Sequence, residues 1–190
     1  MILDELRKLV SRCLRGDQAA MVDLVDRYKG QVFGLCLRML GQREDAEDAA
    51  QETFQRVLKS LGRWDASREF EPWVLAIAGN RCRTALAARR RHPSAQPLEV
   101  ELVPDADDGR QAAEQLAEEV RRALLTLRPE YRQAFVLFHE QQLEYSEIAQ
   151  TLDVPLGTVK TWVYRARREL MHDLRQRGIH QETDNDLRKV

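Results

Sequence analysis

Hydrophobic residues recur at steps of three and four along most of the chain, the spacing that gives an α-helix one buried face. The pattern predicts a first helix over residues 2–15, a second that closes at Gly41, a third that closes near Leu61 and a fourth that opens at Pro72. Asp17 is suited to cap the second of these helices. We therefore expect the N-terminal part of the chain to be entirely helical.

The segment 92–109 interrupts this pattern. It contains three of the six prolines and a block of acidic residues, and it has no helical period, which is typical of a flexible linker. The helical period then returns. The sequence predicts an all-α fold of two small helical domains at 1–95 and 113–175, with the linker between them at 96–112 and a tail at 176–190.

The stretch 145–170, YSEIAQTLDVPLGTVKTWVYRARREL, contains two short amphipathic helices with a breaker between them. Ile148 and Leu152 lie on the apolar face of the first, and Pro155 prevents that helix from continuing. The second helix has its own apolar stripe, formed by Val159, Val163, Ala166 and Leu170. This arrangement indicates a helix-turn-helix.

The remaining face of the second helix is basic. It carries four cations and no acid, and its members are Lys160, Thr161, Tyr164, Arg165, Arg167 and Arg168. A basic helix held at an angle by a tight turn is the geometry that enters the major groove of DNA. From periodicity alone, an ordinary helical hairpin with a solvated basic face remains an alternative.

The composition is that of a soluble globular protein, with 43% hydrophobic and 32% charged residues in 190. The net charge of −1 conceals a segregation of charge along the chain. The segment 81–91 has five arginines and no acid, whereas 44–52 has five acids, and 99–108 has five acids and no cation. Different surfaces therefore suit different partners.

Several classes of protein are disfavoured. No run of apolar residues is long enough for a transmembrane helix, and the start of the chain is too charged for a signal peptide, so a cytoplasmic protein is expected. The three cysteines lack CxxC spacing and are expected to be buried hydrophobes. HEQQL, from His139, resembles a zinc-protease motif but has Leu143 at the second ligand position. We expect neither cofactor, metal nor enzymatic activity.

Two features of the N-terminal part allow more than one interpretation. The acids of the third helix lie near its N-terminus, where the helix dipole favours them. They either cap the helix and add solubility, or they form a docking surface for a basic partner. The loop 62–71 places aromatic residues close to arginines, as single-stranded DNA binding requires. We expect Trp73 to be buried in the core and leave Trp64 open.

Taken together, these segments resemble a known family. REDAEDAAQETF, FEPWVLAIAGNRCR, LRPEYRQAFVLF and the helix-turn-helix stretch occur in the order found in the extracytoplasmic-function (ECF) sigma factors of bacteria, within the sigma-70 family. The resemblance covers roughly 17–174. It implies two helical domains, regions two and four, that bind core RNA polymerase and direct it to promoters.

The resemblance also implies which residues bind each partner. The clamp coiled coil of the largest polymerase subunit would contact Asp45, Asp48, Gln51 and Glu52, and the polymerase flap is a further expected contact. The minus-ten promoter element would be bound by Trp64, Ser67, Arg68, Phe70, Asn80 and Arg81. The minus-thirty-five element would be bound by Thr158, Lys160, Thr161, Tyr164, Arg165 and Arg168.

Two positions depart from the family pattern. Gly79 stands where a basic residue is common, which removes one expected phosphate contact, and Glu144 replaces the serine that usually caps the first helix of the motif. An anti-sigma factor is a further expected partner, and the two domains of the free protein are expected to pack on each other. A stand-alone helix-turn-helix regulator and a protein-binding adaptor remain as alternatives.

Overall fold

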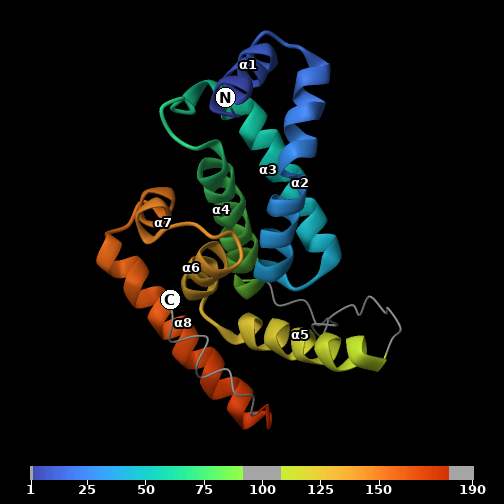
Figure 1. Cartoon of the computed structure of the whole chain (residues 1–190), viewed down its shortest axis with the longest axis vertical. Coiled ribbons are helices and arrows are strands. Elements are labelled where there is room, and N and C mark those ends of the chain that lie inside the picture. Colours follow the sequence, from blue (N-terminus) through green and yellow to red (C-terminus); the bar gives the residue numbers. More distant parts are fainter. Residues whose placement is uncertain (1, 92–107, 180–190) are drawn as a thin grey trace.

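The computed structural model describes residues 2–91 and 108–179. Within these residues the N-terminal unit consists of α1 (Ile2–Leu14), α2 (Gln18–Leu40), α3 (Arg43–Ser60), a 3-10 turn η1 (Leu61–Arg63) and α4 (Phe70–Arg91). The helices α2, α3 and α4 run side by side, and α1 crosses one end of them (Figure 1). The described residues contain no β-strand, in agreement with the predicted all-α fold.

The C-terminal unit contains α5 (Asp108–Thr126), α6 (Pro129–His139), α7 (Tyr145–Leu152) and α8 (Leu156–Gln176). Helix α5 begins at Asp108, inside the segment that we expected to be linker. The prediction was wrong there because the first turns of α5 contain few large apolar residues from which a helical period can be recognised. The rest of the expected linker, and residues 180–190 of the expected tail, lie outside the described residues.

Local signals fix the helix ends much as the sequence predicted. The Asp17 carboxylate accepts a hydrogen bond from the backbone N–H of Ala20, 3.1 Å away, and so caps α2. Gly41 ends α2 with a φ of 82°, a left-handed conformation that favours glycine. At the start of α7, Glu144 and Glu147 form a capping box, in which the Glu147 carboxylate accepts from the backbone N–H of Glu144 at 2.7 Å. Glu144 therefore serves where a serine was expected.

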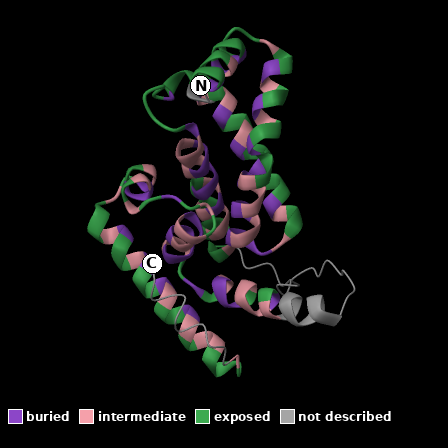
Figure 2. Ribbon diagram, viewed as in Figure 1, coloured by how far each residue is buried: buried purple, intermediate pink, exposed green. Residues whose placement is uncertain are grey.

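The core of the N-terminal unit lies between α2, α3 and α4. Its members are almost inaccessible to solvent, and they include Leu24, Leu35, Val57, Val74 and Leu75. Figure 2 shows the buried positions on the inner sides of these helices and exposed positions on their outer sides. All three cysteines are buried and reduced, as predicted.

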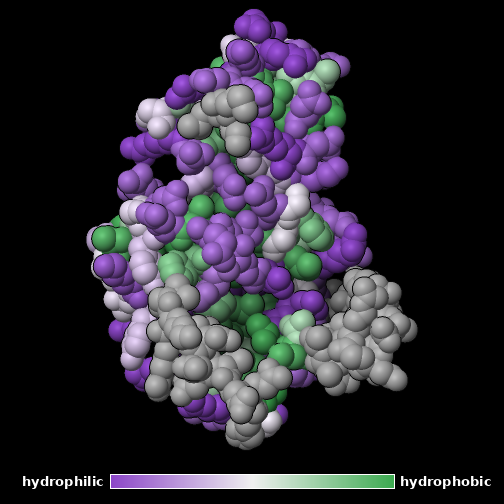
Figure 3. Space-filling view, in the orientation of Figure 1, coloured by the Kyte–Doolittle hydropathy of each residue, from purple (hydrophilic) through white to green (hydrophobic). Residues whose placement is uncertain are grey.

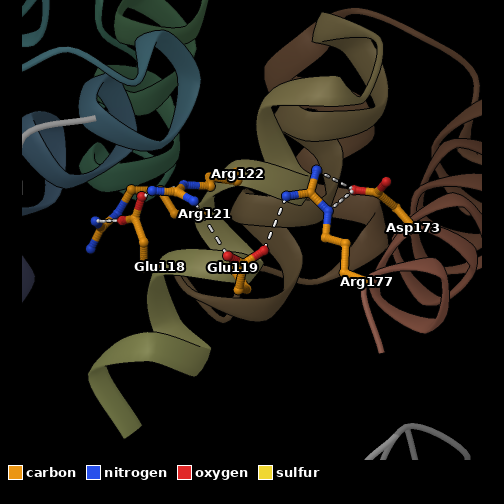
Figure 4. Close-up of polar contacts among 6 residues, drawn as sticks. All are labelled: Glu118, Glu119, Arg121, Arg122, Asp173 and Arg177. Carbon is orange, nitrogen blue, oxygen red and sulfur yellow. Dashed lines mark hydrogen bonds and ion pairs between the residues drawn. The ribbon is translucent and has the colours of Figure 1, made fainter. Parts of the chain in front are cut away.

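A second cluster packs α5 against α8, with Leu124 and Leu170 among its buried residues. An ion-pair network closes the outer edge of this contact (Figure 4). Arg177, just after α8, lies 3.0 Å from the Glu119 carboxylate on α5 and also pairs with Asp173 at 3.0 Å. The network therefore ties the end of α8 to α5.

The two units pack directly on each other. Helix α6 lies against α2 and α4, α7 lies against α4, and α5 touches α2 (Figure 1). The main hydrophobic core is continuous across this boundary, since it includes Val136 and Ile148 of the C-terminal unit. The packing of the two units that we expected for the free protein is thus present.

The face of the molecule drawn in Figure 3 is mostly hydrophilic, and hydrophobic residues gather toward its lower centre, around α5 and α6. Large hydrophobic side chains exposed elsewhere include Val22 on α2 and Tyr164 on α8. Within the described residues, no helix combines the length and the apolar character needed to span a bilayer.

Candidate nucleic-acid and protein interfaces

The helix-turn-helix forms as the sequence predicted. Asp153 ends α7 with a φ of 53°, and its backbone N–H bonds back to carbonyls of α7. Aspartate tolerates this left-handed conformation better than most residues do. Pro155 then precedes the first turn of α8, so the chain changes direction within three residues.

One side of α8 is buried and the opposite side faces solvent. Val159, Val163, Ala166 and Leu170 are at most 5% exposed, which confirms the predicted apolar stripe. Among the residues proposed to read DNA, Thr158 is half-buried and the others are exposed, namely Lys160, Thr161, Tyr164, Arg165 and Arg168. The helix therefore presents hydroxyl, aromatic and cationic groups together on an open surface.

Arg165 is held in place at the edge of this surface. Its guanidinium donates to the Tyr131 hydroxyl at 2.8 Å and lies over the same ring, with 6.0 Å between Cζ and the centroid. Because Tyr131 is buried on α6, this contact fixes the direction of an otherwise flexible cation. A preoriented arginine loses less conformational entropy when it binds a phosphate or a base edge.

Arg167 corrects the sequence analysis, which placed it on the outward basic face. Its Nε donates to Nε2 of His139 at 3.0 Å, and its guanidinium lies 5.5 Å from the centroid of the Phe138 ring. It is therefore a packing residue between α8 and α6. Burial, together with the nearby charge of Arg167, lowers the pKa of His139 to about 4, so this histidine is neutral near pH 7.

The loop before α4 is held by local polar contacts. Asp65 accepts from both the backbone N–H and the hydroxyl of Ser67, at 2.9 and 2.7 Å, and these bonds lower the pKa of the Asp65 carboxyl. From α1, the Arg7 guanidinium donates twice to the carbonyl of Ala66, at 2.8 and 3.1 Å. Arg68 is exposed and lies 3.4 Å from Asp65.

The aromatic residues of this loop lie mainly in the core. Phe70 is 1% exposed, and Trp64 packs edge-on against it with 5.1 Å between ring centroids. Trp73, expected in the core, is half-buried and lies 5.3 Å from Phe70. In this conformation neither Trp64 nor Phe70 offers a free face on which a base could stack, and Ser67 and Arg68 form the accessible part of the loop.

A groove of ≈ 630 Å³ runs between the last turns of α3, the η1 turn and the middle of α4. It brings together Asn80 and Arg81, which the sequence analysis singled out. The remaining lining residues are Arg56, Lys59, Ser60, Arg63, Ile77 and Thr84. The groove thus combines four cations with an amide, two hydroxyl groups and one apolar side chain.

The contribution of α3 to this groove was not predicted from the sequence. Arg56, Lys59 and Arg63 follow one another at steps of three and four, so a helical projection places them on one side. The spacing in the sequence therefore indicates a basic side of α3. That this side lies close to Arg81 depends on how α3 packs against α4, which periodicity does not reveal.

The acidic face of α3 is only partly open. Asp48, Gln51 and Glu52 are exposed, whereas Asp45 is half-buried. Glu52 forms an ion pair with Arg81, and Asp45 forms one with Arg89. Arg89 also donates to the side-chain oxygen of Gln42 at 2.8 Å. The acids of α3 and the arginines of α4 are therefore neighbouring surfaces linked by ion pairs.

Two family models match the chain, and they divide it as the structure does. Sigma-70 region 2 matches residues 24–92, and Sigma-70 region 4 matches residues 117–170. The first contains the acidic face, the loop and the groove. The second contains the helix-turn-helix.

Individual relatives agree with these matches. The chain is 32% identical to the ECF RNA polymerase sigma factor SigW of Bacillus subtilis over 90% of this chain and 97% of that protein. It is 31% identical to the ECF RNA polymerase sigma-E factor of Escherichia coli over 84% of this chain and 88% of the relative. The sigma factor RpoE of Bartonella quintana, solved with the anti-sigma factor NepR, has the same fold, with a TM-score of 0.67 at 18% identity over 80% and 95% of the two chains. The chain belongs to the ECF RNA polymerase sigma factors of the sigma-70 family.

Proposed function

We propose that this sigma factor docks on core RNA polymerase through the exposed acidic residues of α3 and reads promoter DNA with two separate surfaces. Membership of the family makes it a factor that directs core polymerase to promoters, which decides against a stand-alone regulator. The role is one of binding, and we assign the chain no reaction of its own. Because its partners are polymerase and DNA, we place its action in the cytoplasm.

The exposed part of α3 suits a basic protein surface. Asp48, Gln51 and Glu52 lie together on the solvent side of the helix, and the clamp coiled coil implied by the family resemblance is rich in arginine. Arginine binds carboxylates through two parallel hydrogen bonds, which gives such a contact a defined orientation. Asp45, paired with Arg89, is a weaker candidate for direct contact.

The groove beside Asn80 suits single-stranded DNA of the minus-ten element. Four cations along its walls match a phosphate backbone, and the amide of Asn80 can hydrogen-bond a base edge. Extruding a base from the duplex costs a few kcal/mol, which such a site must offset. With Trp64 and Phe70 buried, we expect hydrogen bonds from Asn80, Ser67 and Arg68 to contribute more than aromatic stacking.

The exposed face of α8 suits the major groove at the minus-thirty-five element. Lys160 and Thr161 lie near the N-terminus of the helix, where residues of a recognition helix meet base edges, and Arg168 lies two turns further on, where a cation can reach the phosphates. The observation that carries the whole proposal is that one chain presents an exposed acidic face on α3, an exposed basic face on α8 and a groove with four cations beside Asn80.

The acidic face can be tested by binding to purified core polymerase, measured by fluorescence anisotropy. Asp48→Arg with Gln51→Arg should weaken binding at least about tenfold, because like charges then face each other across the contact. Glu5→Arg with Gln18→Arg makes the same change in charge at exposed positions of α1 and α2, and should bind like the wild type. Equal affinity of the two double variants would contradict the assignment.

The groove calls for a different assay, the binding of holoenzyme to a DNA fork with a single-stranded minus-ten segment. Arg56→Gln with Lys59→Gln should reduce the dependence of log affinity on log salt by about 1.4, the value for two contacts to single-strand phosphates. Arg27→Gln with Lys29→Gln removes two exposed cations from α2 instead. If both variants show the wild-type salt dependence, the groove does not hold the strand.

We further propose that a protein inhibitor controls this sigma factor. The support is the fold shared with the sigma factor RpoE of Bartonella quintana, which was solved in complex with the anti-sigma factor NepR. Co-purification of the tagged chain from its native cells, at stationary phase and after stress, would test this. Recovery of core polymerase alone under every condition would contradict it.

A further inference from the structure

Tyr131, in the first turn of α6, contacts two arginine side chains that come from different segments of the chain. Its ring is 5% exposed, and α6 packs against α8 (Figure 1). Arg165 of α8 has its Cζ 6.0 Å from the ring centroid, and Arg128, the residue just before α6, has its Cζ 5.8 Å from the same centroid. One buried aromatic ring therefore gathers two guanidinium groups at the surface between α6 and α8.

Neither of these guanidinium groups is neutralised by an acid. Arg128 and Arg165 are both exposed, and among the described residues neither forms an ion pair with a carboxylate. Other arginines of the same unit are paired with glutamates, namely Arg121, Arg122 and Arg177 (Figure 4). Two unpaired cations gathered on one ring repel each other, and an anion that contacts both relieves the repulsion.

The hydroxyl group of Tyr131 holds one of the two guanidinium groups in a fixed direction. Arg165 donates to this hydroxyl at 2.8 Å, and the tyrosine itself belongs to the buried cluster between α5, α6 and α8. Arg165 lies four residues after Thr161 and three before Arg168, so the helix places the three residues along one side of α8. The held guanidinium therefore borders the face of α8 that we propose binds the minus-thirty-five element.

Arg128 extends this basic surface beyond α8. It directly precedes Pro129, the first residue of α6, so its side chain projects from the start of that helix. Glu130 in the same turn forms no ion pair with Arg128 or Arg165 within the part of the chain that the structure describes. The cationic surface thus continues from the side of α8 onto the beginning of α6.

The phosphates of a DNA strand suit this pair of arginines. A guanidinium group binds a phosphate through two parallel hydrogen bonds. A strand of duplex DNA offers one phosphate for about every 3.4 Å of helix axis, so two guanidinium groups on one ring can contact neighbouring phosphates. Such contacts carry no sequence information themselves, but they fix how a recognition helix lies in the major groove.

We propose that Arg128 and Arg165 form a phosphate clamp on the DNA backbone beside the minus-thirty-five element, with Tyr131 as the positioning residue that holds Arg165. The inference rests on the proposed function and extends the DNA-binding surface to a residue outside the helix-turn-helix. The clamp binds the backbone of one strand while the exposed face of α8 meets the base edges.

The contribution of Arg128 is measured with holoenzyme on a promoter duplex identified by run-off transcription, using fluorescence anisotropy over a range of salt concentrations. Arg128→Gln should weaken binding and reduce the dependence of log affinity on log salt by about 0.9, the value for one phosphate contact. Arg128→Lys keeps the charge and should retain most of the wild-type salt dependence. Arg15→Gln removes an exposed cation from α1 and should bind like the wild type. A wild-type salt dependence in Arg128→Gln would overturn the clamp.

The positioning role of Tyr131 is tested by a double-mutant cycle in the same assay. Tyr131→Phe keeps the ring and removes only the hydroxyl, and it should weaken DNA binding about two- to tenfold, the effect of one hydrogen bond. Combined with Arg165→Gln it should have no further effect, because the hydroxyl acts through Arg165. An equal loss of affinity in both backgrounds would show a purely structural role and contradict the proposal.

Uncharged methylphosphonate linkages, placed one at a time along each strand, locate the phosphate that Arg128 contacts. At one position beside the minus-thirty-five element the uncharged linkage should weaken binding of the wild type and leave binding of Arg128→Gln unchanged, since that contact is already lost. If every linkage that weakens the wild type also weakens Arg128→Gln by the same factor, Arg128 contacts no phosphate and the clamp is wrong.

The double variant Lys160→Gln with Arg168→Gln separates the clamp from the proposed function. If this variant lowers the salt dependence and Arg128→Gln does not, α8 binds DNA as proposed and the clamp alone fails. If neither variant lowers it, α8 does not contact the promoter and both proposals fail. A lower salt dependence in each variant, with the Tyr131 effect confined to proteins that retain Arg165, is the result that we expect.

Discussion

His139 shows how the surroundings of one side chain link stability to pH. Burial on α6, followed by the nearby charge of Arg167, lowers its pKa from 6.5 to about 4 in the folded protein. Between these two values the unfolded chain binds a proton that the folded chain does not. The free energy of unfolding should therefore fall as the pH drops from about 6.5 to about 4. Above pH 6.5 the ring is neutral in both states, so His139 adds no pH dependence there.

His139→Gln should remove this dependence, because glutamine does not titrate. Urea unfolding at pH 7.5 and at pH 5 measures the difference. We expect the wild type to lose about 1–2 kcal/mol more than the variant on acidification, a value reduced from the full shift because the ring is partly exposed. Equal losses in the two proteins would show that His139 is solvated.

At the scale of elements, the turn between α2 and α3 determines where the acidic face points. Gly41 adopts a φ of 82°, which an alanine reaches only at a cost of about 1–2 kcal/mol. Gly41→Ala should lower the free energy of unfolding by that amount in chemical denaturation. Gly34→Ala, inside α2 and with room for a Cβ, should instead stabilise by up to about 1 kcal/mol. Similar effects of the two substitutions on the free energy of unfolding would contradict the left-handed conformation of Gly41.

Helix α8, which we propose binds the minus-thirty-five element, gives a prediction about the salt dependence of DNA binding. Lys160→Gln with Arg168→Gln should weaken holoenzyme binding to duplex minus-thirty-five DNA, and should reduce the salt dependence of log affinity by about 1.8 for two phosphate contacts. The control is Lys8→Gln with Arg15→Gln, which removes two exposed cations near the N-terminus. An unchanged salt dependence in the α8 variant would place the DNA elsewhere.

Elements were predictable from the sequence to the extent that local chemistry fixes them. Asp17, Gly41 and Pro155 mark helix ends whatever the chain does elsewhere, and the period of α8 identified its buried stripe. Arg167 and Trp64 were placed less well, because their positions depend on which helix packs opposite. The groove beside Arg81 could not be predicted in this way, because it depends on how whole helices pack.

At the scale of the whole molecule, one chain carries the acidic surface that we propose docks on polymerase and the two basic surfaces that we propose bind DNA. The family matches support the division into two units, and the packing of α6 and α7 on α2 and α4 places both in one closed body. A net charge of −1 is the sum of these opposed surfaces. The properties of the whole therefore follow from segregated charge and from the packing of the two units.

Run-off transcription with purified core polymerase on fragmented genomic DNA shows whether the acidic face of α3 is needed for promoter-specific initiation. We expect specific transcripts with the wild type and with Glu5→Arg plus Gln18→Arg, and a loss of at least about tenfold with Asp48→Arg plus Gln51→Arg. Full transcription by the Asp48 and Gln51 variant would show that the polymerase binds a surface other than the acidic face of α3.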